Sequence, residues 1–109
     1  MTSAAHDAVL HEFRAYYLAD ELPEHMGEGE ARRMAYASAG RLRRRVGAGG
    51  VPAVIALLRG MRDDPAHPAV REVESSTLIE WTDEPEQWAE FREILGGIVE
   101  ELERTRLAE

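Results

Sequence analysis

The clearest hydrophobic pattern in this chain lies toward its C-terminal end, where apolar residues recur at intervals of three and four positions. The stripe consists of Trp88, Phe91, Leu95, Ile98 and Leu102. Residues three and four apart share one face of an α-helix, so the pattern predicts an amphipathic helix over about 84–107. Thr82 or Asp83 is the expected cap of this helix, and Pro85 suits its first turn.

Two adjacent glycines, Gly96 and Gly97, stand inside this predicted helix. Each costs about 1 kcal/mol relative to alanine at an exposed helical position. A close helix crossing, or a slight kink where only a hydrogen atom fits, would explain them. A second predicted helix, over 28–46, has an inner face of small residues that includes Ala31, Ala35 and Ser38. Such a face lets a neighbouring helix approach closely, so this helix is a candidate for the centre of the bundle.

Three more segments show helical periodicity. The first covers about 3–19, with Ser3 as its expected cap and apolar residues such as Val9 and Phe13 on overlapping helical rows. The second covers 51–62 and is apolar on nearly every side, which predicts the most buried helix. The third covers 69–81 and is read as a helix, although its last residues also fit a short strand. Residues 20–28 are a predicted connection.

These elements predict an all-α fold, a compact bundle of four or five helices that forms one domain over 1–109. The chain has no cysteine, which excludes disulfides and thiolate metal sites. It lacks a secretory signal pattern and any long apolar run, so we expect a cytoplasmic protein with no membrane segment. All 13 basic residues are arginines, which with the abundant alanine is typical of a GC-rich bacterial genome.

The net charge of −8 argues against nonspecific attraction to nucleic acid or anionic lipid. The charge is unevenly distributed, because residues 1–62 hold nine arginines against seven acids, whereas residues 83–109 hold nine acids against three arginines. The one concentrated positive segment is the arginine run over 41–45. It suits a solvated helix end that pairs with acids of the last helix, a patch for an acidic protein partner, or a phosphate contact.

Two short motifs suggest chemistry. His11-Glu12 begins like the zinc helix of gluzincin metallopeptidases, but the second histidine is replaced by Ala15, so we expect no metal site and interpret the pair as a surface His-Glu pair. Arg62 and His67 resemble the R-x4-H motif of HEPN-type ribonucleases. That resemblance implies a metal-independent ribonuclease in which the histidine is an acid or base and the arginine stabilises charge. Pro65 interrupts the helix that holds both residues in that family.

The function favoured by the sequence is a non-enzymatic module that docks a protein partner through a helix face, as antitoxins, immunity proteins, adaptors and assembly chaperones do. No cofactor and no nucleic acid are expected. The candidate partner-binding residues are Arg41, Arg44, Arg45, Trp81, Glu100, Glu101 and Glu103. The alternatives are the ribonuclease and a homo-oligomer that buries part of the last helix against its own copy.

Overall fold

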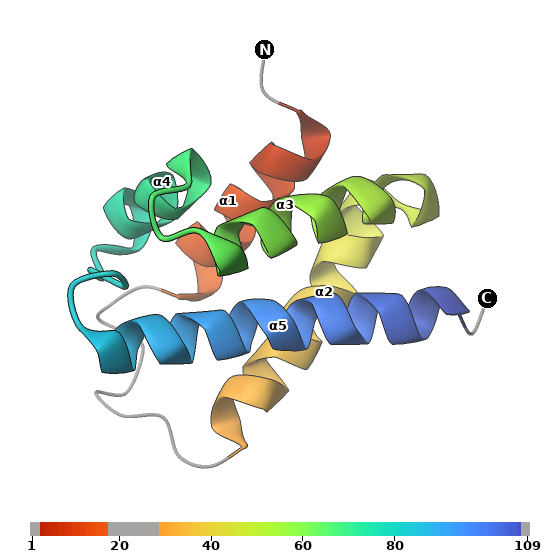
Figure 1. The fold of residues 1–109 in the computed structure, drawn as a ribbon. Coiled ribbons are helices and arrows are strands. Elements are labelled where there is room, and N and C mark those ends of the chain that lie inside the picture. The colour runs from red at the N-terminus through yellow and green to blue at the C-terminus, as the bar shows by residue number, and fades with distance from the viewer. Residues whose placement is uncertain (1–2, 18–28, 108–109) are drawn as a thin grey trace.

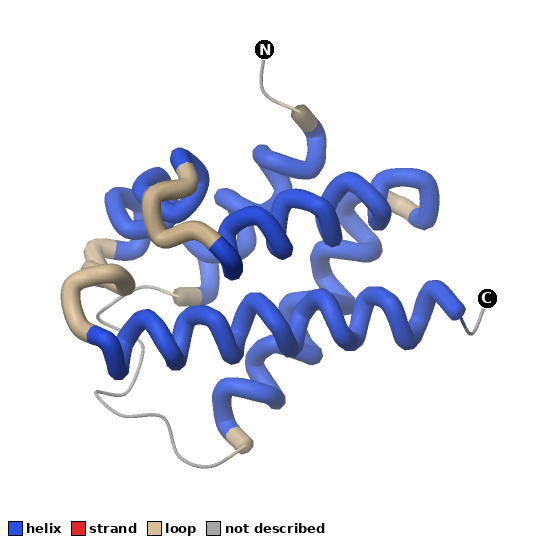
Figure 2. The backbone as a smooth tube through the Cα atoms, in the orientation of Figure 1, coloured by secondary structure: helices blue, strands red, loops and turns tan. Residues whose placement is uncertain are grey.

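The computed structural model describes residues 3–17 and 29–107 of the chain. Within these residues it has five α-helices, α1 (Ala4–Tyr16), α2 (Glu30–Val46), α3 (Val51–Asp63), α4 (Pro68–Thr77) and α5 (Pro85–Leu107), and a 3-10 turn (Ala48–Gly50) between α2 and α3. Figure 2 shows helices and loops and no strand in this part of the chain. The predicted all-α bundle is therefore confirmed. The first helix ends at Tyr16 and the second begins at Glu30, so both are shorter than the predicted 3–19 and 28–46, because Tyr17 and Gly29 have non-helical backbones. The predicted connection over 20–28 lies outside the described residues.

The longest helix, α5, organises the bundle. It packs across α2 and alongside α3, while α4 packs against α1 (Figure 1). The side chain of His6 on α1 meets Glu72 on α4, with 2.8 Å between Nε2 and Oε2. The predicted cap of α1 is confirmed, because the Ser3 hydroxyl accepts a hydrogen bond from the His6 amide at 3.1 Å. No helix in the described ranges is both long enough and apolar enough to cross a bilayer.

The crossing of α2 and α5 explains the glycine pair of the last helix. A β-carbon added at Gly97 would lie 2.8 Å from the Cβ of Ala35, closer than two such carbons approach in real proteins. Gly97 therefore permits the contact, and the small inner face of α2 permits it from the other side. The close crossing predicted from the sequence is confirmed. The stripe of α5 is buried at Phe91, Leu95, Ile98 and Leu102.

Aromatic side chains form a cluster at the N-terminal end of α5. Phe91 is fully buried, and its ring centroid lies 5.0 Å from Trp81, 5.5 Å from Phe13 and 5.8 Å from Trp88. The indole nitrogen of Trp81 donates to the Thr77 hydroxyl at 3.3 Å. Trp81, which we predicted to be a partner contact, is thus a buried core residue. Burial against Phe91 and a satisfied N–H account for it without a partner.

The helix predicted over 69–81 ends at Thr77. The next residue, Leu78, has a left-handed backbone with a φ of 62°, and its amide donates to the Glu74 carbonyl at 2.9 Å. This conformation is a common helix stop. The Glu74 carboxylate then accepts from the Thr82 amide at 3.2 Å and the Thr82 hydroxyl at 3.1 Å. Thr82 therefore ties the turn to α4 and does not act as the predicted cap of α5.

The third helix has one buried and one exposed face. Its inward residues are Val51, Val54, Ile55, Leu58 and Met61. Its outward residues include Pro52, Ala53, Ala56 and Arg59. We predicted it to be the most buried helix because nearly all its residues are apolar. Several of these apolar residues are small, however, so their exposure to water costs little free energy. The helix with the most buried residues is α5.

Candidate functional site

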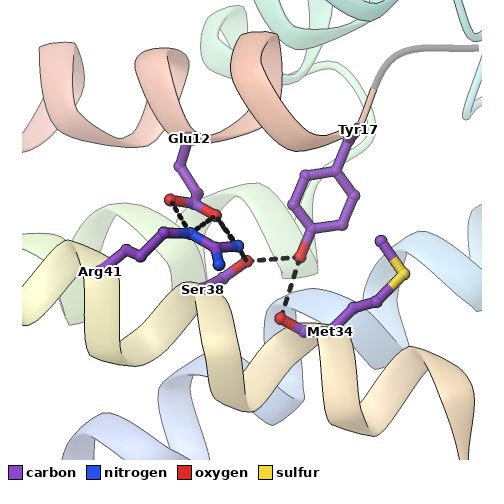
Figure 3. A network of polar contacts seen from close by, with 5 residues as sticks. All are labelled: Glu12, Tyr17, Met34, Ser38 and Arg41. Atoms are coloured by element: carbon purple, nitrogen blue, oxygen red, sulfur yellow. Dashed lines mark hydrogen bonds and ion pairs between the residues drawn. The ribbon is translucent and has the colours of Figure 1, made fainter. Parts of the chain in front are cut away.

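A buried ion pair joins α1 to the C-terminal half of α2. Glu12 on α1 is only 3% exposed. Its carboxylate accepts from Arg41 on α2, with 2.6 Å between Arg41 Nη2 and Glu12 Oε2 and 3.1 Å between Arg41 Nε and Glu12 Oε1. Figure 3 shows the two side chains reaching toward each other across the helix interface. The interpretation of His11-Glu12 as a surface pair is therefore wrong for Glu12, whereas His11 is exposed.

The pair belongs to a short chain of hydrogen bonds. The Ser38 hydroxyl donates to Glu12 Oε2 at 2.9 Å and lies 2.6 Å from the Tyr17 hydroxyl. Serine has a single hydroxyl hydrogen and an ionised carboxylate only accepts, so Ser38 donates to Glu12 and Tyr17 donates to Ser38. The Tyr17 hydroxyl also approaches the Met34 carbonyl, at 3.4 Å. Each buried polar side chain of the network has a partner, as low-dielectric surroundings require.

Burial shifts the ionisation of the tyrosine in this network. Loss of solvent around Tyr17 raises its pKa from 10.0 to about 12, and the nearby Glu12 charge acts in the same direction. Its hydrogen bond with Ser38 and the charge of Arg41 oppose the shift. The hydrogen bond from Arg41 to Glu12 raises the pKa of the guanidinium above its ordinary value. The phenol and the guanidinium thus remain protonated throughout the physiological range.

The raised pKa of Tyr17 predicts a loss of stability in alkali. The folded state holds the phenol proton until about pH 12, whereas the unfolded chain releases it near pH 10, so stability falls as pH rises through this window. We expect a decrease of about 2 kcal/mol by pH 12, since each pKa unit corresponds to about 1.4 kcal/mol. Urea unfolding of wild type and Tyr17→Phe at several alkaline pH values measures it. The variant should lose this slope, whereas Tyr36→Phe, at an exposed tyrosine, should keep it. Equal slopes in wild type and Tyr17→Phe would contradict the assignment.

A surface depression lies directly beside the ion pair. Its volume is about 420 Å³, and we call it the arginine depression; it is lined by His11, Glu12, Tyr16, Arg41, Arg44 and Arg45. The guanidinium carbon of Arg41 sits 3.7 Å from the centre of the Tyr16 ring, a cation–π arrangement. The Tyr16 side chain remains 45% exposed. The helix junction thus presents an aromatic ring and three guanidinium groups around one concave surface.

The arginines of this depression differ in whether a carboxylate balances their charge. Arg41 is neutralised by Glu12, and its side chain is 29% exposed. Arg44 and Arg45 are exposed and form no ion pair with any residue that the structure describes. Two uncompensated positive charges therefore flank the depression on a chain whose net charge is −8. Arg41, Arg44 and Arg45 thus line one depression, but Arg41 pairs with α1 and not with an acid of the last helix, as one interpretation of the arginine run required.

The three acidic candidates on α5 are each engaged by an arginine of the same chain. Glu100 faces Arg32 on α2, with 3.9 Å between Oε2 and Nη2. Glu103 forms an ion pair with Arg59 on α3. Arg104 donates to Glu101 one turn earlier, which lowers the pKa of that carboxyl. These acids therefore have local partners, in contrast to Arg44 and Arg45.

Arg62 and His67 also have local structural roles. Arg62 lies in the last turn of α3, where its Nε lies 3.1 Å from Oδ1 of Asp63 and its carbonyl accepts from Arg92. His67 caps α4, because its Nδ1 accepts from the Ala69 amide at 3.1 Å. The turn between them is fixed by the Asp64 side chain, which accepts from the Ala66 amide at 2.9 Å. The two motif residues thus lie at the ends of two different helices.

Known proteins offer no guide to this site. Comparisons with protein families, curated proteins and solved structures gave no match for the chain. Among residues 3–17 and 29–107, no group of three or more histidine, aspartate or glutamate side chains is arranged to hold a metal ion. The chemistry of the arginine depression must therefore be read from its own residues.

Proposed function

We propose that this protein is a non-enzymatic, cytoplasmic binding module that docks a protein partner through the arginine depression. The observation that carries the proposal is the unpaired state of Arg44 and Arg45 beside an exposed Tyr16, at a concave junction of two helices. Arginine and tyrosine are, together with tryptophan, the residues enriched where binding energy is concentrated in protein interfaces. The three acidic candidates on α5, Glu100, Glu101 and Glu103, by comparison, already have arginine partners.

Charge favours an acidic protein surface as the partner. Two free guanidinium groups attract carboxylates and can bind each of them through two parallel hydrogen bonds. Nucleic acid is a poorer fit, because its closely spaced phosphates would meet the repulsion of a molecule with a net charge of −8. Local attraction to a few carboxylates survives this background, since exposed charges are screened over about 10 Å at ordinary salt. The arginine depression therefore suits a small contact with a few carboxylates of an acidic protein surface.

Charge reversal tests whether this face is the docking face. Tagged wild-type protein and the double variant Arg44→Glu/Arg45→Glu are each used to capture proteins from bacterial lysate. The amount of captured protein should be at least about tenfold lower for the variant, because its two glutamates repel an acidic partner that the arginines attract. The matched control is Arg33→Glu/Arg71→Glu, which changes two other exposed arginines, one near the start of α2 and one on α4. Quantitative mass spectrometry of the retained proteins, with circular dichroism to check folding, gives the measurement. Equal retention by wild type and the first variant would refute the docking face.

A further inference from the structure

We propose that the arginine depression receives neighbouring carboxylate side chains of an acidic peptide segment, with an apolar side chain of that segment against Tyr16. This inference rests on the proposed function and names the chemistry of its partner. It follows from three features of the site: the divergence of Arg44 and Arg45, the free donors of Arg41, and the position of Glu12.

The first feature is the direction of the two unpaired arginines. Consecutive residues of an α-helix project about 100° apart, so Arg44 and Arg45 leave α2 in different directions although both line the depression. They flank the helical row of Arg41, which lies one turn earlier. The Arg44 guanidinium reaches back along α2, since its Nη1 lies 3.9 Å from the place where a β-carbon on Gly40 would be. Two side chains that leave the helix in different directions suit two separate carboxylates better than one compact anion.

The second feature is the hydrogen-bonding state of Arg41. Its Nε and Nη2 donate to Glu12, which leaves the two hydrogens on Nη1 without an acceptor among the described residues. The ion pair and the Tyr16 ring together hold the guanidinium in place. A ligand carboxylate can therefore accept from Nη1 while Arg41 stays bound to Glu12. Because the group is already ordered, little conformational entropy is lost on binding.

The third feature is the carboxylate of Glu12, which lines the same depression. A phosphate ester brings close to two negative charges to one point, and at this point the charge of Arg41 is already balanced by Glu12. A peptide distributes its charges, so that its carboxylates can reach Arg44 and Arg45 while uncharged groups pass over Glu12. The volume of about 420 Å³ fits a few side chains and is too small for a folded domain. Protein carboxylates are thus the favoured ligand.

The aromatic wall adds a requirement on the peptide. Tyr16 is 45% exposed, and Arg41 stacks over its ring. An apolar side chain placed against the remaining surface removes aromatic area from water, which is favourable. The segment should therefore combine neighbouring acids with an aromatic or aliphatic residue.

Titration of the full-length protein with synthetic peptides tests the inference. The probe is a fluorescein-labelled peptide in which two glutamate pairs flank a phenylalanine, and the reference peptide has glutamine at every glutamate. At low ionic strength we expect the acidic peptide to bind at least tenfold more tightly than its reference. Arg44→Gln/Arg45→Gln should weaken binding at least tenfold, and Arg33→Gln/Arg71→Gln by less than about twofold, since surface charges away from the site contribute little.

Further arms distinguish other ligands. Equal binding of the acidic and glutamine peptides, or no binding of either at millimolar concentration, would overturn the acidic segment. Tighter binding of a labelled single-stranded RNA, or displacement of the peptide by inorganic phosphate at equal concentration, would overturn the choice of carboxylate. Self-association that Arg44→Gln/Arg45→Gln abolishes in sedimentation would make a second copy the occupant and overturn a separate partner. If the peptides fail but charge reversal still removes captured proteins from the lysate, the docking face stands and only its ligand chemistry is wrong.

Discussion

Replacing Phe91 with alanine is expected to lower the free energy of unfolding by about 4 kcal/mol, because the substitution empties the centre of the aromatic cluster. Phe91 is fully buried and contacts the rings of Phe13, Trp81 and Trp88, with centroid separations from 5.0 to 5.8 Å. The loss combines the transfer of a phenyl ring to water with a cavity that three large rings cannot close. Chemical denaturation followed by circular dichroism measures it.

The conservative variant Phe91→Leu separates packing from general perturbation. Leucine refills much of the space, so the cost should fall to less than half of that for alanine. Alanine at Trp88, which is only partly buried at the edge of the same cluster, should also cost less than alanine at Phe91. A loss below about 1 kcal/mol for Phe91→Ala would show that α5 does not pack on this cluster as described.

Replacing Arg41 with alanine is expected to lower the free energy of unfolding by about 2–3 kcal/mol. The change leaves Glu12, at 3% exposure, with Ser38 as its remaining donor. Removal of one partner from a fully buried ion pair costs about 3–5 kcal/mol, and the cost here is lower because the Arg41 side chain keeps 29% of its exposure. The same denaturation experiment measures it.

A double variant shows whether the cost comes from the stranded charge. In Glu12→Met/Arg41→Met both charges are absent, so we expect a smaller loss than for Arg41→Ala alone, because no buried carboxylate lacks its counterion. Arg41→Lys should be intermediate, since an ammonium group cannot reproduce the paired hydrogen bonds of a guanidinium. If the losses in the free energy of unfolding for Glu12→Met and Arg41→Met add up to the loss for the double variant, the two residues are not coupled.

The helical framework was predictable because its signals are local. The spacing of the apolar stripe in α5 depends only on helix geometry. The glycine pair predicted a close helix crossing, and in the structure Gly97 meets Ala35 there. Which helix packs against Gly97 could not be predicted, because the path of the chain between α2 and α5 depends on loops that have no periodic pattern. Element types were therefore clear from the sequence except over 69–81, where the last residues also fitted a strand, while contacts between elements came from the fold.

Errors arose where one side chain decides the outcome. Glutamate is usually a surface residue, so Glu12 was predicted to be exposed. It lies three positions after Val9 and four after Ala8, however, and therefore on the buried face of α1; this helical spacing could have predicted its burial. The end of α4 was missed because a leucine, and not a glycine, adopts the left-handed conformation at position 78. Trp81 then leaves the helix and turns into the core, which periodicity cannot foresee.

The candidate site was predictable in part. The arginine run over 41–45 was evident in the sequence as the one concentrated positive segment. Their different states were not evident, because these depend on Glu12 from another helix. Likewise, the sequence could not show that Glu100 and Glu103 face arginines more than forty residues away. Long-range ion pairs thus decide which charges remain available to a partner.

An NMR titration of the isotopically labelled protein with the acidic peptide tests the central proposal most directly. If the arginine depression is the docking site, the largest amide shifts should fall in residues 11–16 of α1 and 40–46 of α2, and they should vanish in Arg44→Gln/Arg45→Gln. Shifts centred on α4 or the C-terminal half of α5, or no shifts at millimolar peptide, would contradict it.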